Sequence, residues 1–152
     1  MKIAHSIKIT VFVKEGEDEE KVKRKMVGSI PFDIEQEKIE LKERVTAGFN
    51  EKEIKIFEIL LEKHRHIEAF LEKLARELSE EAKELILRQA ESRLDEECNF
   101  FLRFSKEKLM EENELWVTDQ GNCFHIKMNV AAFPKKKENA LEIIRNVFKL
   151  QE

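Results

Sequence analysis

The stretch from Phe124 to Lys137 reads FHIKMNVAAFPKKK, and it joins the two periodicities from which the fold of this chain can be predicted. Apolar and polar residues alternate from Phe124 to Val130, which is the pattern of a strand with one buried face, and the strand is predicted to continue as far as Phe133. Pro134 ends that strand because proline has no backbone N–H to donate. Three lysines follow, and an amphipathic helix begins after them. A strand therefore brings a cluster of positive charge to the start of a helix.

The same two patterns recur along the rest of the chain. Strands are predicted where apolar residues alternate with polar ones or form short runs between turns, at residues 2–14, 34–45, 54–61, 98–104, 115–117 and 124–133. Helices are predicted where apolar residues recur three and four positions apart. They lie between the acidic turn at residues 15–20 and Pro31, at residues 64–78 and 80–94, and after the lysine triplet, where the buried residues fall within 140–148. One or two helical turns are predicted at residues 106–112. Gly48-Phe49-Asn50 is predicted to be a hairpin turn, and Ser79 a helix N-terminus. This order predicts one α+β domain over residues 1–152, with a mostly antiparallel sheet and helices on one face.

The composition limits the class of protein. Hydrophobic residues make up 41% and charged residues 39% of the 152 positions, so the chain can build a core and is not disordered. Dense lysine and glutamate with few glycines and prolines is typical of thermophile proteins. The two cysteines form no CxxC motif and are predicted to be reduced thiols. Because no signal peptide is visible and no apolar run approaches the roughly 20 residues of a membrane span, we expect a soluble, cytoplasmic protein without membrane contact.

The charge of the chain is unevenly placed. The net charge is −4, but residues 123–152 carry six lysines or arginines against three glutamates, a local net charge of +3. The remaining residues therefore sum to −7. An acidic chain can still bind a polyanion, because charges more than about 10 Å away are screened and the local patch decides.

The lysine triplet is the first candidate anion site. Lys135, Lys136 and Lys137 oppose the dipole at a helix N-terminus, at a cost of up to about 1 kcal/mol each. Two interpretations carry equal weight: a solvated and slightly unfavourable turn, or an anion site that combines the lysines with free helix N–H groups. Phosphates of RNA fit the second interpretation.

The two strands at residues 98–104 and 124–133 supply a second candidate surface. Lys127 shares the polar side of its strand with His125 and Asn129. Phe101 and Arg103 share one side of the other strand, where an exposed ring beside an arginine could stack on a base. Burial of the phenylalanines on both sides of that strand is the favoured interpretation.

The sequence offers little support for catalysis or metal binding. It contains no G-x-S-x-G elbow, no P-loop and no G-x-G-x-x-G motif. His64 and His66 would point about 200° apart on a helix, so they are predicted to be ordinary helix-start histidines. The acidic residues show no pattern that separates them from a solvated face. We therefore expect no cofactor, no metal and no enzymatic activity.

Four blocks of sequence carry a resemblance to a known family. They are AHSIKITVFV, GF, LDEECNFFLR and HIKMNVAAFP, at residues 4–13, 48–49, 94–103 and 125–134. Through these blocks the chain resembles, nearly end to end, an archaeal family of RNA-binding proteins that are also described as predicted exosome subunits. The last two blocks are the most specific. After them, the family pattern Leu-Asp-Lys is replaced by Phe104-Ser105-Lys106, which removes an acidic residue and any role it had.

The resemblance implies a fold and a function. The implied fold is a compact α+β domain similar to ribosomal protein L5 or to double-stranded-RNA-binding domains. The implied function is non-catalytic recognition of the backbone and shape of structured or double-stranded RNA, with low specificity, in RNA processing or ribosome-related metabolism. Exosome or ribosomal proteins are the implied protein partners.

The residues predicted to contact phosphate combine both candidate surfaces. They are Lys127, Lys135, Lys136, Lys137 and Arg103, with Lys106 and Arg65 at the margin. The alternative is a protein-interaction subunit that docks a basic partner through an acidic helix surface. That surface would consist of Glu80, Glu81, Glu84, Glu91, Asp95, Glu96 and Glu97.

Overall fold

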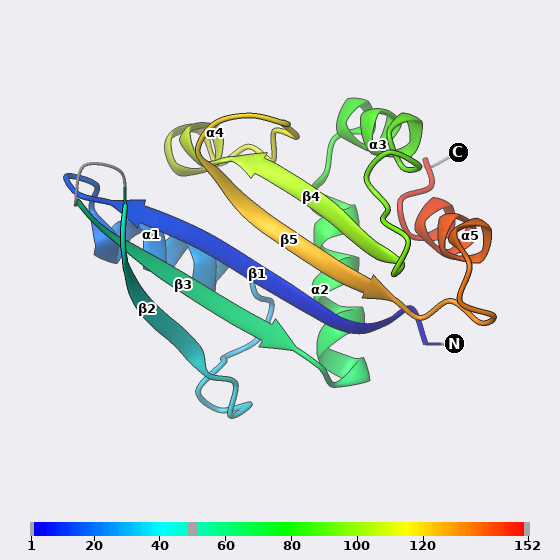
Figure 1. Cartoon of the computed structure of the whole chain (residues 1–152), viewed down its shortest axis with the longest axis horizontal. Coiled ribbons are helices and arrows are strands. Elements are labelled where there is room, and N and C mark those ends of the chain that lie inside the picture. The colour runs from blue at the N-terminus through cyan, green and yellow to red at the C-terminus, as the bar shows by residue number, and fades with distance from the viewer. Residues whose placement is uncertain (1, 49–51, 151–152) are drawn as a thin grey trace.

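The computed structural model describes residues 2–48 and 52–150, in which five strands form one antiparallel sheet (Figure 1). The strands are β1 (Ala4–Lys14), β2 (Leu41–Ala47), β3 (Glu53–Leu61), β4 (Asn99–Ser105) and β5 (Cys123–Val130). Their order across the sheet is β2-β3-β1-β5-β4, so the first and last strands of the chain are neighbours. The strands predicted at residues 2–14, 54–61, 98–104 and 124–133 are thereby confirmed in outline.

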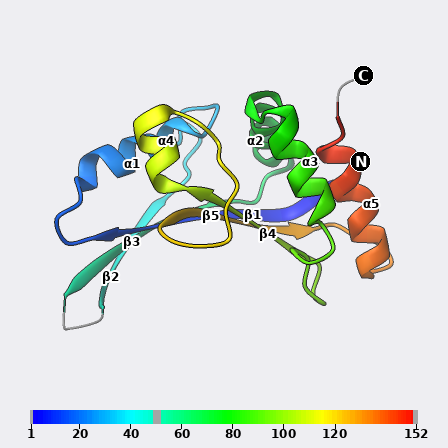
Figure 2. The same cartoon turned by 90° about the horizontal axis from the view of Figure 1, so that it is seen from above.

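The helices cover one side of this sheet. They are α1 (Glu19–Gly28), α2 (His64–Glu77), α3 (Glu80–Arg88), α4 (Lys106–Glu112) and α5 (Lys137–Val147). Figure 2 shows α1 to α4 on one side of the sheet and α5 at one end, near the N-terminus. The arrangement confirms the predicted α+β class with helices on one face, while the likeness to ribosomal protein L5 stays a prediction. Among the helices described, none is long and apolar enough to cross a membrane.

The core lies between the helices and the covered face of the sheet. The strands alternate as predicted, because successive side chains of a strand point to opposite faces. The inward residues of β1 include Ile7, Ile9, Val11 and Val13, and those of β5 are Phe124, Ile126, Met128 and Val130. From the helices, Met26, Ile67, Phe70, Ile86 and Ile144 pack against them. The other residues of each strand are left on the uncovered side.

Local side-chain bonds cap two of the helices, and one of these caps is the predicted helix N-terminus at Ser79. The carboxylate of Asp18 accepts a hydrogen bond from the backbone N–H of Lys21, and the hydroxyl of Ser79 accepts one from Ala82, which caps α1 and α3. Helix α3 ends at Arg88, earlier than predicted. The rest of the predicted segment forms a turn that buries Ala90 and a single bridge to β4 that buries Leu94. Burial alone therefore does not distinguish a helix from a compact turn here.

The predicted strand at residues 34–45 is wrong in its first half. The carboxylate of Asp33 accepts a hydrogen bond from the backbone N–H of Glu35, and the N–H of Ile39 donates to the carbonyl of Ile34 at 2.8 Å. These bonds close turns, and β2 begins only at Leu41. Ile34 nevertheless enters the core, which explains its apolar signal.

Three further details of the strands differ from the predictions. A bulge between Ala4 and Ser6 reverses the alternation at the start of β1, so Ala4 is buried and His5 is exposed. The last strand ends at Val130, before the cis peptide bond at Pro134. The predicted strand at residues 115–117 is reduced to a single bridge to β4. The predicted hairpin turn falls largely on residues 49–51, outside the described part of the chain.

The outer edge of β4 is occupied by loop backbone. The N–H of Phe101 donates to the carbonyl of Arg93, and the N–H of Ser105 donates to that of Trp116, each at 2.9 Å. The N–H of Thr118 donates to the carbonyl of Arg103 at the same distance. The loops before β4 and after α4 therefore lie against this edge and border the uncovered face.

Candidate nucleic-acid interface

The side chains that the strands point away from the helices form a surface that we call the open face. Residues directly opposite one another in an antiparallel pair lie on the same face, so the register of β1, β5 and β4 fixes its rows. One row places Lys8, Lys127 and Phe101 side by side. The next row places Thr10, His125 and Arg103 side by side. The predicted polar side of β5 is thus confirmed, and it lies at the centre of this surface.

The open face carries an excess of positive charge. Its strand positions hold the cations Lys8, Lys14, Lys42, Arg44, Arg103 and Lys127. Among the outward strand positions, Glu58 is the single carboxylate in the described residues. The ion pairs within 4.0 Å between described residues involve other cations. A chain with net charge −4 therefore presents a basic face.

Two phenylalanines are exposed on the same face. Phe101 is 38% exposed, whereas Phe100 on the other side of β4 is 1% exposed. The interpretation that the phenylalanines of this strand are buried on both sides is therefore wrong for Phe101. Phe12 on β1 is 40% exposed, and its ring centroid lies 5.7 Å from that of His125. The open face combines flat aromatic groups with cations.

The side chain of Arg103 is held in place by a hydrogen bond to a backbone carbonyl, and it forms no ion pair with a carboxylate of the described residues. One guanidinium nitrogen donates a hydrogen bond to the backbone carbonyl of Asp119 at 3.1 Å. The Asp119 carboxylate is itself bound by Arg93, at 2.7 Å. Arg103 therefore projects from β4 as an oriented cation, as a phosphate contact requires.

Burial, hydrogen bonds and nearby charges of the open face shift the pKa values of His125 and Asp95. Burial lowers the pKa of His125 below its ordinary value, and the charges of Arg103 and Lys106 lower it further. Burial would raise the pKa of Asp95, but hydrogen bonds from Asn99 and Glu97 outweigh it, and the charge of Lys127 also acts to lower this pKa. His125 is therefore a neutral aromatic group near pH 7, and Lys127 has a carboxylate in its wider surroundings.

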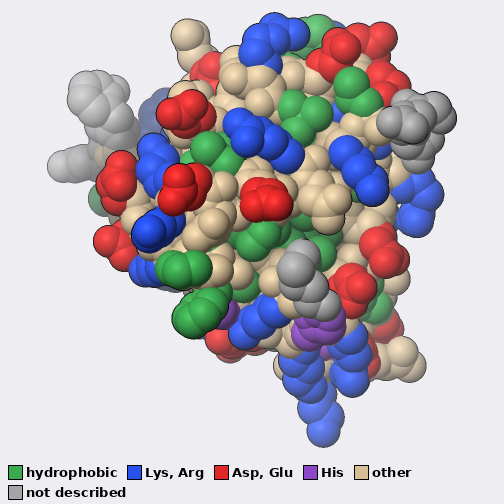
Figure 3. Space-filling view, turned by 90° about the vertical axis from the view of Figure 1, so that its right-hand side faces the viewer, with side chains coloured by type: hydrophobic (Ala, Val, Ile, Leu, Met, Phe, Trp, Pro, Cys, Tyr) green, Lys and Arg blue, Asp and Glu red, His purple; other side chains and the backbone are tan. Residues whose placement is uncertain are grey.

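Two lysines of the triplet are paired with a nearby acidic loop. Lys135 lies 3.0 Å from a carboxylate oxygen of Glu97, and Lys137 lies 3.7 Å from Glu96. Lys136 occupies the N-cap position of α5 and makes no side-chain capping bond. Figure 3 shows the end of the molecule that carries α5, where basic and acidic side chains are interspersed. Glu96 and Glu97 therefore offset two of the three positive charges that oppose the helix dipole. The triplet lies away from the rows of the open face.

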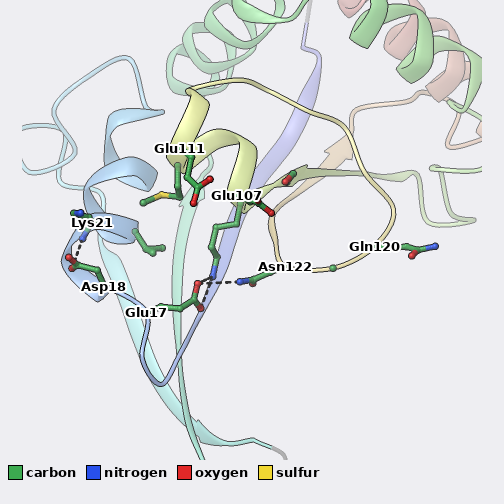
Figure 4. Close-up of a pocket in the computed structure, with 12 residues that line it drawn as sticks. Glu17, Asp18, Lys21, Glu107, Glu111, Gln120 and Asn122 are labelled. Carbon is green, nitrogen blue, oxygen red and sulfur yellow. Dashed lines mark hydrogen bonds and ion pairs between the residues drawn. The ribbon is translucent and has the colours of Figure 1, made fainter.

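Lys106 is buried and lines a cleft of about 500 Å³. Figure 4 shows Glu17 and Asn122 lying close together in this cleft. The ammonium group of Lys106 bonds to the Glu17 carboxylate at 3.2 Å and to the backbone carbonyl of Phe12, and Asn122 donates a second hydrogen bond to Glu17. Burial lowers the pKa of Lys106, although the Glu17 charge opposes this effect. Lys106 therefore joins the β1–α1 turn, α4 and the loop before β5, away from the rows of the open face.

Arg65 is separated from the open face as well. It lies in the first turn of α2, on the helical side of the sheet, and binds the carboxylate of Glu37 at 3.1 Å. The same carboxylate oxygen lies 2.9 Å from Nε2 of the buried His66. Within residues 2–48 and 52–150, no group of three His, Cys, Asp or Glu side chains could hold a metal ion.

Several residues of the open face are not among those predicted from sequence. Lys8, Phe12 and Lys14 occupy alternate positions of the first predicted strand, so their common side was readable from the sequence. Lys42 and Arg44 on β2 could not be placed, because their side depends on the pairing of β2 with β3. Of the predicted residues, the open face brings together Lys127 and Arg103.

The fold and this surface define an α+β protein that has one sheet face covered by helices and the other open, basic and partly aromatic. Sheets of this kind are among those that bind nucleic acid through an uncovered face. The chain belongs to the family whose model is described as RNA binding, which matches residues 6–130. The predicted family is thereby confirmed, while the exosome connection stays a prediction.

One similar protein carries the same description, and two solved structures share the fold. The RNA-binding protein PAB1135 of Pyrococcus abyssi is 32% identical over 142 residues, which cover 93% of this chain and 92% of the relative. A DUF54 protein of Archaeoglobus fulgidus has a similar structure, with a TM-score of 0.82, 26% identity and coverage of 95% and 99% of the two chains. A DUF54 protein of Methanothermobacter thermautotrophicus has a TM-score of 0.78 at 28% identity, covering 97% and 99%.

Proposed function

We propose that this protein is a non-catalytic RNA-binding protein and that it binds RNA through the open face. The observation that carries the proposal is the excess of cations, unpaired among the described residues, on the uncovered side of an acidic chain. Lys8, Lys127 and Arg103 are its central phosphate contacts, and Lys14, Lys42 and Arg44 extend the surface toward β2. Phosphate contacts of this kind supply affinity and orientation without reading sequence.

The pairing of Lys8 with Lys127 is the strongest local support. The two residues are directly opposite one another on adjacent strands. Like charges in that position destabilise a sheet, so packing and stability do not explain why both are lysine. A bound polyanion reverses the sign of this interaction, because each ammonium group then meets a phosphate. The pair therefore fits a surface that is occupied when the protein works.

The biological setting forms the second part of the proposal. We infer a role in RNA processing or in ribosome-related metabolism, with exosome or ribosomal proteins as protein partners. The support is the resemblance of the chain to its family and the description of the family as RNA binding. Sequencing of RNA crosslinked to the protein in cells tests this part. Recovery of one RNA class with its processing intermediates is the expected result.

Two matched sets of variants test the binding surface. Lys8→Gln with Lys127→Gln removes two charges from the open face, whereas Lys135→Gln, Lys136→Gln and Lys137→Gln together remove three from the end of α5. We expect the double variant to weaken RNA binding more than the triple variant. It should also flatten the dependence of log K on log salt by about 0.7–0.9 for each phosphate that is no longer neutralised. Fluorescence anisotropy over a salt series measures both quantities.

The comparison separates local contacts from net charge. If only net charge attracted RNA, the triple variant would lose more affinity, because it removes more charge. Equal affinity and salt dependence in the double variant and the unchanged protein would overturn the assignment of the open face. Circular dichroism checks that each variant remains folded.

A second candidate function has one observation in its favour. The outer side of α3 and the turn after it expose Glu80, Glu81, Glu84 and Glu91, an acidic surface on the opposite side of the molecule from the cations. Such a surface fits a basic protein partner. Capture from a native lysate with and without nuclease separates the two functions, because partners held through this surface persist after the RNA is removed.

A further inference from the structure

We propose that the open face holds RNA as an unpaired strand, with one base stacked on Phe101 and another on the aromatic pair of Phe12 and His125. This inference rests on the proposed RNA-binding function and adds the form of RNA that the surface accepts. It departs from the structured or double-stranded RNA that the family resemblance implied. The chemistry that selects the ligand is the exposed base face, which every unpaired nucleotide offers.

The first stacking site is the ring of Phe101. It is an exposed aromatic group on a sheet, with Lys127 directly across on β5 and Arg103 two residues along β4. Its backbone is fixed on both sides, because β4 pairs with β5 and the N–H of Phe101 also donates to the carbonyl of Arg93. A base on this ring would leave its phosphate within reach of the two neighbouring cations. Stacking of this kind tolerates any base, because each has a π face.

The second stacking site is the pair formed by Phe12 and His125. The two rings are in contact, tilted by 36° with centroids 5.7 Å apart. Since burial and the neighbouring charges lower the pKa of His125, the imidazole is neutral near pH 7 and behaves as an aromatic group. Arg103 lies directly across from His125 and supplies the adjacent positive charge.

The distance between the two stacking sites suits two nucleotides of the same RNA strand. Phe12 lies four residues along β1 from Lys8, which shares a row with Phe101. A β-strand rises about 3.3 Å per residue, and neighbouring β-strands lie about 4.8 Å apart. The two stacking sites are therefore roughly 13 Å apart along the β-strands and roughly 10 Å apart across the sheet. Lys127 and Arg103 lie between them. An unpaired strand can therefore place bases on both aromatic sites while its phosphates meet the cations.

A duplex cannot use this surface in the same way. In a double helix the base faces are stacked on one another, and proteins reach mainly the phosphates, the 2′-hydroxyls and the groove edges. The rings of Phe101 and Phe12 would then lie against a charged backbone, where they contribute nothing. The aromatic groups of the open face therefore favour unpaired RNA.

The test compares an unstructured 12-nucleotide RNA with a 12-base-pair RNA duplex, using the full chain. Fluorescence anisotropy gives both affinities for the unchanged protein and for Phe101→Ala, Phe101→Leu, Phe12→Ala and Phe133→Ala. Phe133 is 95% exposed but lies outside the open face, so its variant is the matched control. A 2-aminopurine base in the single strand reports stacking directly, because stacking on an aromatic ring quenches its fluorescence.

The expected result is tighter binding of the single strand. Phe101→Ala should weaken that binding roughly 5- to 150-fold, because the absence of one stacked base costs that much. Phe101→Leu should lose most of the same affinity although it preserves apolar bulk. Phe133→Ala should change nothing.

The outcomes separate this inference from the function on which it rests. If the duplex binds more tightly and both Phe101 variants keep full affinity while the Lys8 and Lys127 double variant does not, the inference is wrong and the RNA-binding surface stands. If the unchanged protein binds neither RNA, or if the double lysine variant binds as well as the unchanged protein, the proposed function itself fails.

Discussion

The ammonium group of Lys135 lies 3.0 Å from the carboxylate of Glu97, a residue 38 positions earlier in the chain. The hydrogen bond to Glu97 raises the pKa of Lys135 above its ordinary value. Together with Lys137 and Glu96, this pair ties the start of α5 to the loop before β4. The most conspicuous positive cluster of the sequence is therefore part of an ion-pair contact between two loops.

The first prediction concerns this contact. Lys135→Gln should leave the midpoint of thermal unfolding unchanged within error, because both side chains are largely exposed and such pairs stabilise a fold very little. Thermal unfolding followed by circular dichroism measures it. A fall as large as that of a buried lysine variant would contradict this interpretation of the ion pair.

The second prediction concerns the buried Lys106. Lys106→Met should destabilise the protein by about 1–3 kcal/mol, because it leaves the carbonyl of Phe12 without its partner and Glu17 without its cation. Urea unfolding measures the change. Lys21→Met is the control, since Lys21 lines the same cleft but its side chain is exposed. Equal stability of the two variants would show that the hydrogen bonds of Lys106 contribute nothing.

The third prediction concerns pH. Because burial and nearby charges lower the pKa of His125, the unfolded chain binds more protons than the folded chain between that lowered pKa and about 6.5. The stability of the unchanged protein should therefore fall as the pH is lowered through about 6.5. In His125→Gln this part of the pH dependence should disappear.

Urea unfolding between about pH 5 and pH 8, the range in which histidine titrates, measures this difference. His5→Gln controls for the removal of an exposed histidine on the neighbouring strand β1. Parallel pH profiles for His125→Gln and the unchanged protein would rule out the assigned environment of His125.

The fourth prediction concerns two glycines in open space. Gly121, in the loop before β5, has a φ of +83°, whereas Gly28 at the end of α1 has no such φ, and an added Cβ would meet nothing within 4 Å at either position. Gly121→Ala should destabilise the protein by about 1–2 kcal/mol, because an L side chain is strained in the left-handed region. Gly28→Ala should stabilise it by about 0.4–1 kcal/mol. Urea unfolding of the two variants measures both changes in the free energy of unfolding. If both variants shifted the stability in the same direction, the left-handed backbone assigned to Gly121 would be contradicted.

Much of the fold could be predicted because local pattern and final structure agree. Alternation on β1 and β5 follows directly from burial of one sheet face, and the cap at Ser79 needs only neighbouring backbone. The predicted element boundaries were wrong where an apolar residue that belongs to a turn is buried in the core. Ile34 and Ala90 reach the core without belonging to a strand or a helix, so their apolar character extended the predicted elements too far.

The candidate site was harder to predict because its parts depend on long-range pairing. Phe101 has apolar neighbours on both sides, and only the packing of Phe100 against the helices shows which side is buried. Lys127 and Lys8 become neighbours through the register of β1 with β5. The acidic partners of the lysine triplet lie in another loop. Local charge in the sequence therefore pointed to the lysine triplet, whereas the cations of the open face become visible as one surface only when strand alternation is combined with strand register.

The outer edge of β4 is occupied by backbone from two loops, which leaves β2 as the edge strand at the other side of the sheet. An unpaired edge can recruit a strand from another molecule and start aggregation. The exposed residues Lys42, Glu43 and Arg44 on β2 work against such pairing, because charged side chains discourage the addition of a further strand. Replacing all three by threonine should thus make the edge of β2 more prone to pair with a strand of another molecule.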